Sequence, residues 1–111
     1  IYSAKKSIEE ALVEYAKAIE IDPKNYLAYY NRGLIYRDKK DLNQAITEYA
    51  KTTEINPDFS KVYINRGVAY FYLKRYSEAL VDLEKAQSLG LKIDAQFLND
   101  IKNLAEEKNK I

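Results

Sequence analysis

Apolar residues recur at helical spacing along most of the chain. In its first part, Ile8, Leu12, Tyr15 and Ile19 follow one another at intervals of three or four residues, with Glu and Lys between them. This spacing places the apolar side chains on one stripe of a helix. We expect that helix to end near Ile21, because Asp-Pro-Lys-Asn follows and proline disfavours helical geometry in the residue before it.

The same periodicity predicts four more helices, paired into two hairpins with short connections. Asp41 is suited to cap the N-terminus of the second helix of the first hairpin. Ser77 or its neighbours mark the turn inside the second hairpin, and Gly90 suits the left-handed residue that ends it. The predicted helices cover residues 26–38, 42–55, 59–72 and 76–89.

A sixth helix is predicted from Asp94 to about residue 107, with Asp94 as its N-cap. It has one apolar stripe, and its other positions are rich in Asn, Asp, Glu and Lys. A stack of helices needs such a terminal helix, which covers the last apolar face and presents a polar face to water. The stripe consists of Phe97, Leu98, Ile101 and Leu104.

Residues 26–59 are repeated in residues 60–93. Eight positions are identical at one constant offset, namely Tyr29, Asn31, Arg32, Gly33, Tyr36, Lys40, Ala45 and Lys51, which recur as Tyr63, Asn65, Arg66, Gly67, Tyr70, Lys74, Ala79 and Lys85. Residues 1–25 match the later part of the same unit. We therefore expect one domain built from a partial repeat (1–25), two repeats (26–59 and 60–93) and a capping helix (94–111).

The repeated positions resemble the signature of the tetratricopeptide repeat. The central unit reads Tyr29-x2-Arg32-Gly33-x2-Tyr36, then Ala45-x3-Tyr49, then Pro57. The chain departs from the signature at Arg32 and Arg66, which replace Leu, at Leu83, which replaces the second aromatic residue, and at Leu91, which replaces Pro. The resemblance implies an all-α, right-handed α-solenoid of antiparallel helical hairpins, and a scaffold that binds other proteins.

Two glycines lie inside predicted helices. Gly33 and Gly67 should each cost about 1 kcal/mol relative to Ala in a helix. We expect a close crossing of the two helices of each hairpin at these points, since Ala45 and Ala79 are also small.

The composition argues against an enzyme. Cys, His, Trp and Met are absent, so disulfides, thiolate and imidazole chemistry and the usual zinc sites are excluded. Carboxylate pairs such as Glu9 and Glu10 are adjacent in a helix and point in different directions. We expect no catalytic residue, no metal and no cofactor.

Charge and hydropathy restrict the partners and the location. The 111 residues carry a formal net charge of +1, so no overall field favours nucleic acid or a membrane surface. No apolar run approaches the length needed to span a bilayer. We expect a cytoplasmic protein, and the start at Ile1 in place of Met predicts a fragment of a longer chain.

A line of asparagines is the first candidate for function. Asn31, Asn65 and Asn99 follow one another at the interval that separates the repeats. The family resemblance places them on the concave face, and an amide, which both donates and accepts, can pair with any peptide backbone. In the alternative interpretation, these amides only bond to neighbouring helices.

Lys61 lies four residues before Asn65 and therefore on the same helix face. Chaperone adaptors of this family hold a peptide carboxylate in a clamp, and the chain is similar to them at Asn31 and Lys61 but has Asn65 where they have Arg. The predicted groove would hold an extended acidic or C-terminal peptide. Its residues are Tyr30, Asn31, Leu34, Arg37, Lys61, Ile64, Asn65, Val68, Phe71, Tyr72, Leu98, Asn99 and Lys102.

Two alternatives remain open. The basic residues Lys61, Arg66, Lys74 and Arg75 lie among aromatic residues, a combination that also occurs in nucleic-acid binders. The first helix, residues 8–21, lacks a hairpin partner, so its exposed apolar stripe could mediate homo-oligomerisation through the N-terminal end.

Overall fold

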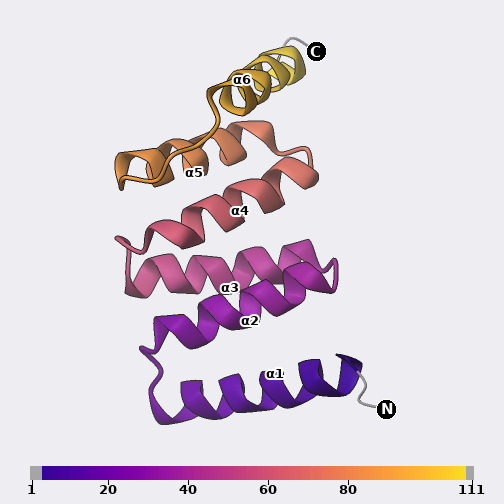
Figure 1. Cartoon of the computed structure of the whole chain (residues 1–111), viewed down its shortest axis with the longest axis vertical. Coiled ribbons are helices and arrows are strands. Elements are labelled where there is room, and N and C mark those ends of the chain that lie inside the picture. The colour runs from indigo at the N-terminus through magenta and orange to yellow at the C-terminus, as the bar shows by residue number, and fades with distance from the viewer. Residues whose placement is uncertain (1–3, 110–111) are drawn as a thin grey trace. The chain divides into compact units, whose positions relative to one another are not determined.

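The computed structural model describes residues 4–109, and these residues form six α-helices and no strand (Figure 1). The six predicted helices are confirmed. The first begins at Ala4 instead of Ile8, and the last continues to Asn109 instead of about residue 107. The helices are α1 (Ala4–Ile21), α2 (Tyr26–Asp38), α3 (Leu42–Ile55), α4 (Ser60–Tyr72), α5 (Tyr76–Ser88) and α6 (Ala95–Asn109).

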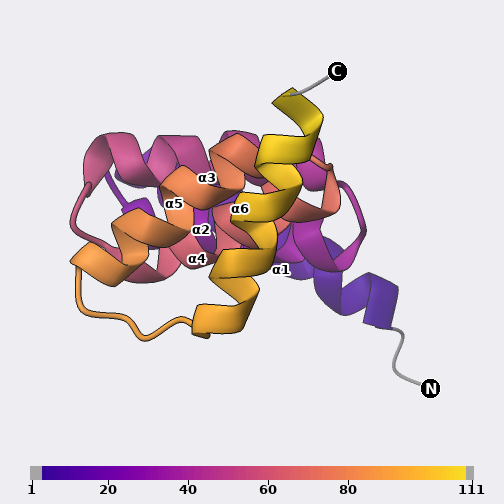
Figure 2. The same cartoon turned by 90° about the horizontal axis from the view of Figure 1, so that it is seen from above.

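The helices belong to two compact units, Ile1–Pro57 and Asp58–Ile111. In the first unit, α2 packs against both α1 and α3, and its contact with α3 is the more extensive. In the second unit, α5 packs against α4 and α6, and Figure 2 shows α6 crossing α5. Each unit therefore contains one complete antiparallel hairpin, α2–α3 or α4–α5, and one additional helix.

Side-chain caps explain where several helices begin. The backbone N–H of Gln44 donates to Asp41 Oδ1 at 3.2 Å, and that of Phe97 donates to Asp94 Oδ2 at 3.0 Å, so both predicted N-caps are confirmed. Asn25 caps α2 in the same manner. The cap position of α5 is Arg75, which makes no side-chain cap bond. The turn inside the second hairpin thus falls on neighbours of Ser77, as the prediction allowed.

Left-handed residues end three of the helices. Gly90 has φ 101°, as predicted, and Lys40 and Lys74 have φ 67° and 61° at the equivalent positions after α2 and α4. At the end of α2, the N–H of Lys40 donates to the carbonyl of Arg37 and that of Asp41 to Tyr36, each at 2.9 Å. This is the Schellman pattern, which pairs the last helical carbonyls.

In each hairpin the two helices cross closely at the point where a glycine of the first helix faces a large side chain of the second. A Cβ built on Gly33 would lie 2.5 Å from Cε1 of Tyr49, and one on Gly67 would lie 2.9 Å from Cγ of Leu83. Such separations are too short for real Cβ contacts. The predicted close crossing is therefore confirmed, and it leaves Tyr49 and Leu83 almost fully buried.

The second unit has an additional apolar cluster that attaches α6. Ile101 is fully buried and Leu98 is only 8% exposed, because both pack against residues of α5. The ring centroids of Phe71 on α4 and Phe97 on α6 are 5.3 Å apart in an edge-on arrangement. Lys108 Nζ also donates to the carbonyl of Lys74 at 2.8 Å. α6 therefore covers the apolar end of the hairpin, as expected for a capping helix.

Candidate functional site

An ion pair joins the two helices of the first hairpin. Arg32 on α2 donates through Nε and Nη2 to Glu48 Oε1 on α3, at 3.0 and 2.8 Å. Gln44 Nε2 donates to the other carboxylate oxygen at 2.9 Å. The Glu48 side chain is 6% exposed, and Arg32 Cζ lies 5.6 Å from the ring centroid of Tyr29. The buried carboxylate is thus satisfied by two side chains.

The second hairpin contains the same arrangement at the equivalent positions of the next repeat. Arg66 donates through Nε to Asp82 Oδ2 and through Nη2 to Asp82 Oδ1, both at 2.8 Å. The Asp82 side chain is 5% exposed, and Arg66 Cζ lies 5.7 Å from the centroid of Tyr63. The hydrogen bonds to Asp82 raise the pKa of Arg66. This bidentate geometry, with two parallel N–H···O bonds, makes the Arg–carboxylate pair stronger than a single hydrogen bond would.

These pairs account for the departure of Arg32 and Arg66 from the Leu of the repeat signature. In each hairpin, the arginine meets a carboxylate on the facing helix, at the same sequence separation. Arg66 was predicted only as one member of a basic cluster, and the structure shows that it neutralises Asp82. Arg75 is also paired, with Glu78 Oε2 at 2.6 Å from its Nη2.

One face of α4 holds most of the predicted partner-binding residues of the second unit. Lys61 is exposed, and Asn65 Nδ2 donates to the carbonyl of Lys61 at 3.0 Å, which places the two residues on adjacent turns. Ile64 and Val68 are half-buried on the same side, and Tyr72 is 68% exposed. The face therefore combines a cation, an amide and apolar side chains.

The other predicted residues of the second unit divide between surface and core. Asn99 and Lys102 are exposed on α6. Phe71 packs in an edge-on arrangement against Tyr72, with ring centroids 5.5 Å apart, and it also contacts Phe97 in the apolar cluster. Leu98 lies in the core of this unit.

In the first unit, the predicted residues lie on α2. Tyr30 is 8% exposed, and its ring centroid is 6.0 Å from that of Tyr49, so burial raises the pKa of Tyr30. Asn31 and Leu34 are half-buried. Arg37 Nη2 lies 3.1 Å from Asp38 Oδ1 in an exposed ion pair. A groove that includes residues of both units stays a prediction.

The described part of the chain contains no group of three or more His, Cys, Asp or Glu side chains arranged to hold a metal ion. Among residues 4–109, no helix is both long enough and apolar enough to cross a membrane.

Family comparisons match nearly the whole repeat region. A family described as "TPR repeat" matches residues 1–36 and 33–73, and one described as "Tetratricopeptide repeat" matches residues 60–89. The chain belongs to the tetratricopeptide repeat (TPR) family, whose members are protein-interaction modules that generally have no enzymatic activity. The predicted all-α, TPR-like fold is thereby confirmed. No curated protein sequence matches the chain.

Several solved structures, TPR domains among them, are similar over most of the chain. The first TPR of Spaghetti (RPAP3), bound to the HSP90 peptide SRMEEVD, is 25% identical with a TM-score of 0.78, and the match covers 95% of this chain and 82% of that one. The Arabidopsis OM64 TPR domain is 28% identical with a TM-score of 0.77, covering 93% and 84%. MamA is 30% identical with a TM-score of 0.72, covering 75% and 48%.

Proposed function

We propose that this chain is a non-enzymatic scaffold that binds an extended peptide segment with an acidic or C-terminal carboxylate. The observation that carries the proposal is the α4 face, where the exposed Lys61 adjoins Asn65 and the apolar Ile64, Val68 and Tyr72. A carboxylate can pair with the ammonium group while apolar side chains of the peptide pack beside it. The similarity to a TPR domain bound to SRMEEVD, a peptide with three acidic residues, supports this chemistry.

Lys61 and Asn65 should contribute unequally. The Asn65 amide already donates to the carbonyl of Lys61, so bonding a peptide through that N–H would require this bond to be exchanged. A hydrogen bond to a charged group contributes about 1.5–3 kcal/mol, compared with about 1 kcal/mol for a neutral one. Lys61 should therefore be the main electrostatic contact, with the amides as weaker backbone contacts.

Nucleic acid and a second copy of the chain have less support as partners. Arg66 and Arg75, which belong to the basic cluster, are engaged with Asp82 and Glu78. This leaves less positive charge for a phosphate backbone, on which nucleic-acid affinity depends. The comparisons lend no support to self-association as the function.

The proposal can be tested by fluorescence anisotropy with labelled SRMEEVD as the probe. Because Lys61 is exposed, Lys61→Ala should weaken binding by about tenfold, the low end for a charge-assisted bond. Asn65→Ala should have a smaller effect. Added salt should reduce the difference between the wild type and Lys61→Ala, since it screens an exposed charge.

A matched control is Lys92→Ala, which removes an exposed lysine from the segment between α5 and α6. It should leave affinity unchanged. If neither Lys61→Ala nor Asn65→Ala changes the affinity of the peptide, the α4 face is not the binding site.

A further inference from the structure

The α4 face offers a bound peptide one exposed cation. Helix α4 contains two cationic residues, Lys61 and Arg66. The Arg66 side chain is 18% exposed and bonds both carboxylate oxygens of Asp82 at 2.8 Å, so its charge is compensated within the hairpin. Lys61 is exposed, one turn before Asn65 on the same side of the helix. The positive charge that α4 presents to a peptide therefore comes from Lys61.

The cations that follow α4 do not add to this charge. Lys74 and Arg75 lie beyond the other end of the helix, about 18 Å from Lys61 along its axis, which is more than the screening length at physiological salt. Arg75 also bonds both carboxylate oxygens of Glu78, at 2.7 and 2.6 Å. Asp58, which is exposed in the turn before α4, adds a negative charge near Lys61. A second anionic group bound beside Lys61 would therefore lack a positive partner on this helix.

Asn65 supplies a neutral group at the place where a second cation on this face would have to lie. Its Nδ2 donates to the carbonyl of Lys61 at 3.0 Å, so one of its N–H groups is already engaged. The carbonyl oxygen of an amide accepts hydrogen bonds, and it is electrostatically unfavourable beside a carboxylate. It suits the N–H of a peptide backbone instead. Lys61 and Asn65 together therefore match one carboxylate that is flanked by peptide N–H groups.

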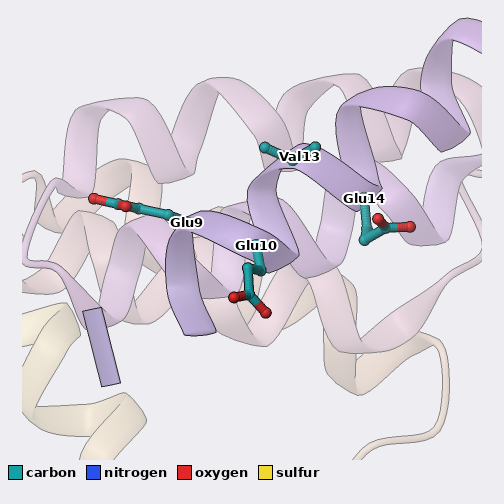
Figure 3. Close-up of a pocket in the computed structure, with 4 residues that line it drawn as sticks. All are labelled: Glu9, Glu10, Val13 and Glu14. Atoms are coloured by element: carbon teal, nitrogen blue, oxygen red, sulfur yellow. The ribbon is translucent and has the colours of Figure 1, made fainter. Parts of the chain in front are cut away.

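The pocket described on α1 has the opposite charge. It is lined by Val13 and by three exposed glutamates, Glu9, Glu10 and Glu14 (Figure 3). Carboxylates that line a surface disfavour an acidic peptide by like-charge repulsion. This pocket therefore does not compete with the α4 face for such a peptide.

We infer that the α4 face takes one carboxylate, from an acidic side chain in the interior of a polypeptide, and not the two carboxylates of a chain that ends in Asp or Glu. A terminal Asp or Glu carries its α-carboxylate and its side-chain carboxylate on the same residue, and Lys61 can compensate only one of them. Desolvating the other without a partner is unfavourable. In an extended chain, neighbouring acidic side chains point to opposite sides, so those that Lys61 does not bind can stay in water. The inference rests on the proposed function and specifies the class of peptide.

Four labelled peptides separate the two kinds of carboxylate in fluorescence anisotropy. They are SRMEEVD and its neutral counterpart SRMQQVN, each with a free C-terminus or a C-terminal amide. Amidation of SRMEEVD should change its affinity by less than about twofold, since the α-carboxylate meets no second cation and stays screened in water. Between the two amides, the loss of the side-chain carboxylates should weaken binding about tenfold. SRMEEVDGSG with a C-terminal amide, in which every acidic residue is internal, should bind within about twofold of SRMEEVD.

Protein variants test whether Lys61 is the group that binds the side-chain carboxylate. In Lys61→Ala, the difference in affinity between the two amides should disappear, because such non-additivity marks a direct contact. Lys92→Ala, which removes an exposed lysine between α5 and α6, is the matched control and should retain the difference. Asn65→Lys adds a second cation one turn from Lys61, and it should strengthen the binding of SRMEEVD with a free C-terminus more than the binding of its amide.

Two results would overturn the inference and leave the proposed function standing. The first is an amidation of SRMEEVD that weakens binding to the wild type about tenfold. Loss of that effect in Lys102→Ala would identify the exposed Lys102 of α6 as the second cation. The second is binding of SRMQQVN with a free C-terminus as tightly as SRMEEVD, which would assign the site to the α-carboxylate of any chain end. If none of the peptides binds, the proposed function is wrong as well.

Discussion

The hydroxyl of Tyr49 allows a sharp test of the packing between α2 and α3. Tyr49 is fully buried, and its hydroxyl is the one described side-chain polar atom that is buried without a hydrogen-bond partner. An unsatisfied buried polar group costs about 1–3 kcal/mol. Tyr49→Phe removes that group and keeps the ring that faces Gly33 and Tyr30. The free energy of unfolding at pH 7 should therefore rise by about 1–3 kcal/mol, the cost of the unsatisfied group.

The same hydroxyl predicts a dependence on pH. Burial raises the pKa of Tyr49 from 10.0 to about 12, because the ionised phenolate is disfavoured away from water. Because this pKa is higher in the folded state than in the unfolded state, the free energy of unfolding keeps its full value below pH 10. It then falls as the pH rises from about 10 to 12. This difference in pKa corresponds to roughly 2.7 kcal/mol. The Phe variant has no phenol at this position and should escape this loss.

Urea denaturation followed by circular dichroism, at several values between pH 7 and pH 12, would measure both effects. The stability difference between Tyr49→Phe and the wild type should be constant up to about pH 9 and should increase above pH 10. Burial also raises the pKa values of Tyr30 and Tyr63, so part of the alkaline loss should persist in the variant. Tyr15→Phe is the matched control, since Tyr15 is the half-buried equivalent of Tyr49.

Two results would refute this reasoning. If Tyr49→Phe is less stable than the wild type at pH 7, the hydroxyl has a partner that stabilises the fold. If the stability difference does not change between pH 9 and pH 12, the environment of the hydroxyl does not disfavour its ionisation.

Two substitutions test the helix crossing and the ion pairs. Gly33→Ala should lower the free energy of unfolding by about 1–3 kcal/mol, as measured by thermal or urea denaturation. The new Cβ would lie 2.5 Å from the Tyr49 ring, and the cost of this overpacking exceeds the gain in helix propensity. A variant more stable than the wild type would contradict the close crossing. Arg66→Met should cost about 3 kcal/mol by leaving Asp82 as an unpaired buried charge, and adding Asp82→Leu should restore most of that stability. Equal losses in the single and double variants would show that the pair itself is not what Arg66 contributes.

The helices and their ends could be predicted because they depend on local sequence. The predicted bounds 26–38 and 42–55 agree with α2 and α3, since apolar spacing, caps and turn residues act within a few positions. Asp41 and Asp94 cap their helices through bonds to residues three positions later. The glycine requirement was also predictable, because an unfavourable residue repeated inside two helices indicates a compensating contact.

The position of side chains between helices was harder to predict. Tyr30 and Leu98 were assigned to the binding surface, and the structure places both in apolar cores. Helical periodicity shows which residues share a face, but which neighbouring helix covers that face depends on packing between segments distant in sequence. The assignment of the remaining surface residues as a binding site stays a prediction.

The sequence alone determined that this chain is a repeat of helical hairpins of the TPR type, because a fixed repeat period and helical spacing are both readable in one dimension. Only the tertiary structure showed that Arg32 bonds Glu48 and Arg66 bonds Asp82. One signal was available, since Glu14, Glu48 and Asp82 are acidic at equivalent positions. Their partners could be identified only once the facing helix was in place. The free energy of a buried charge depends on the residues that exclude water from it and on the groups that bond it, and these come from a helix distant in sequence.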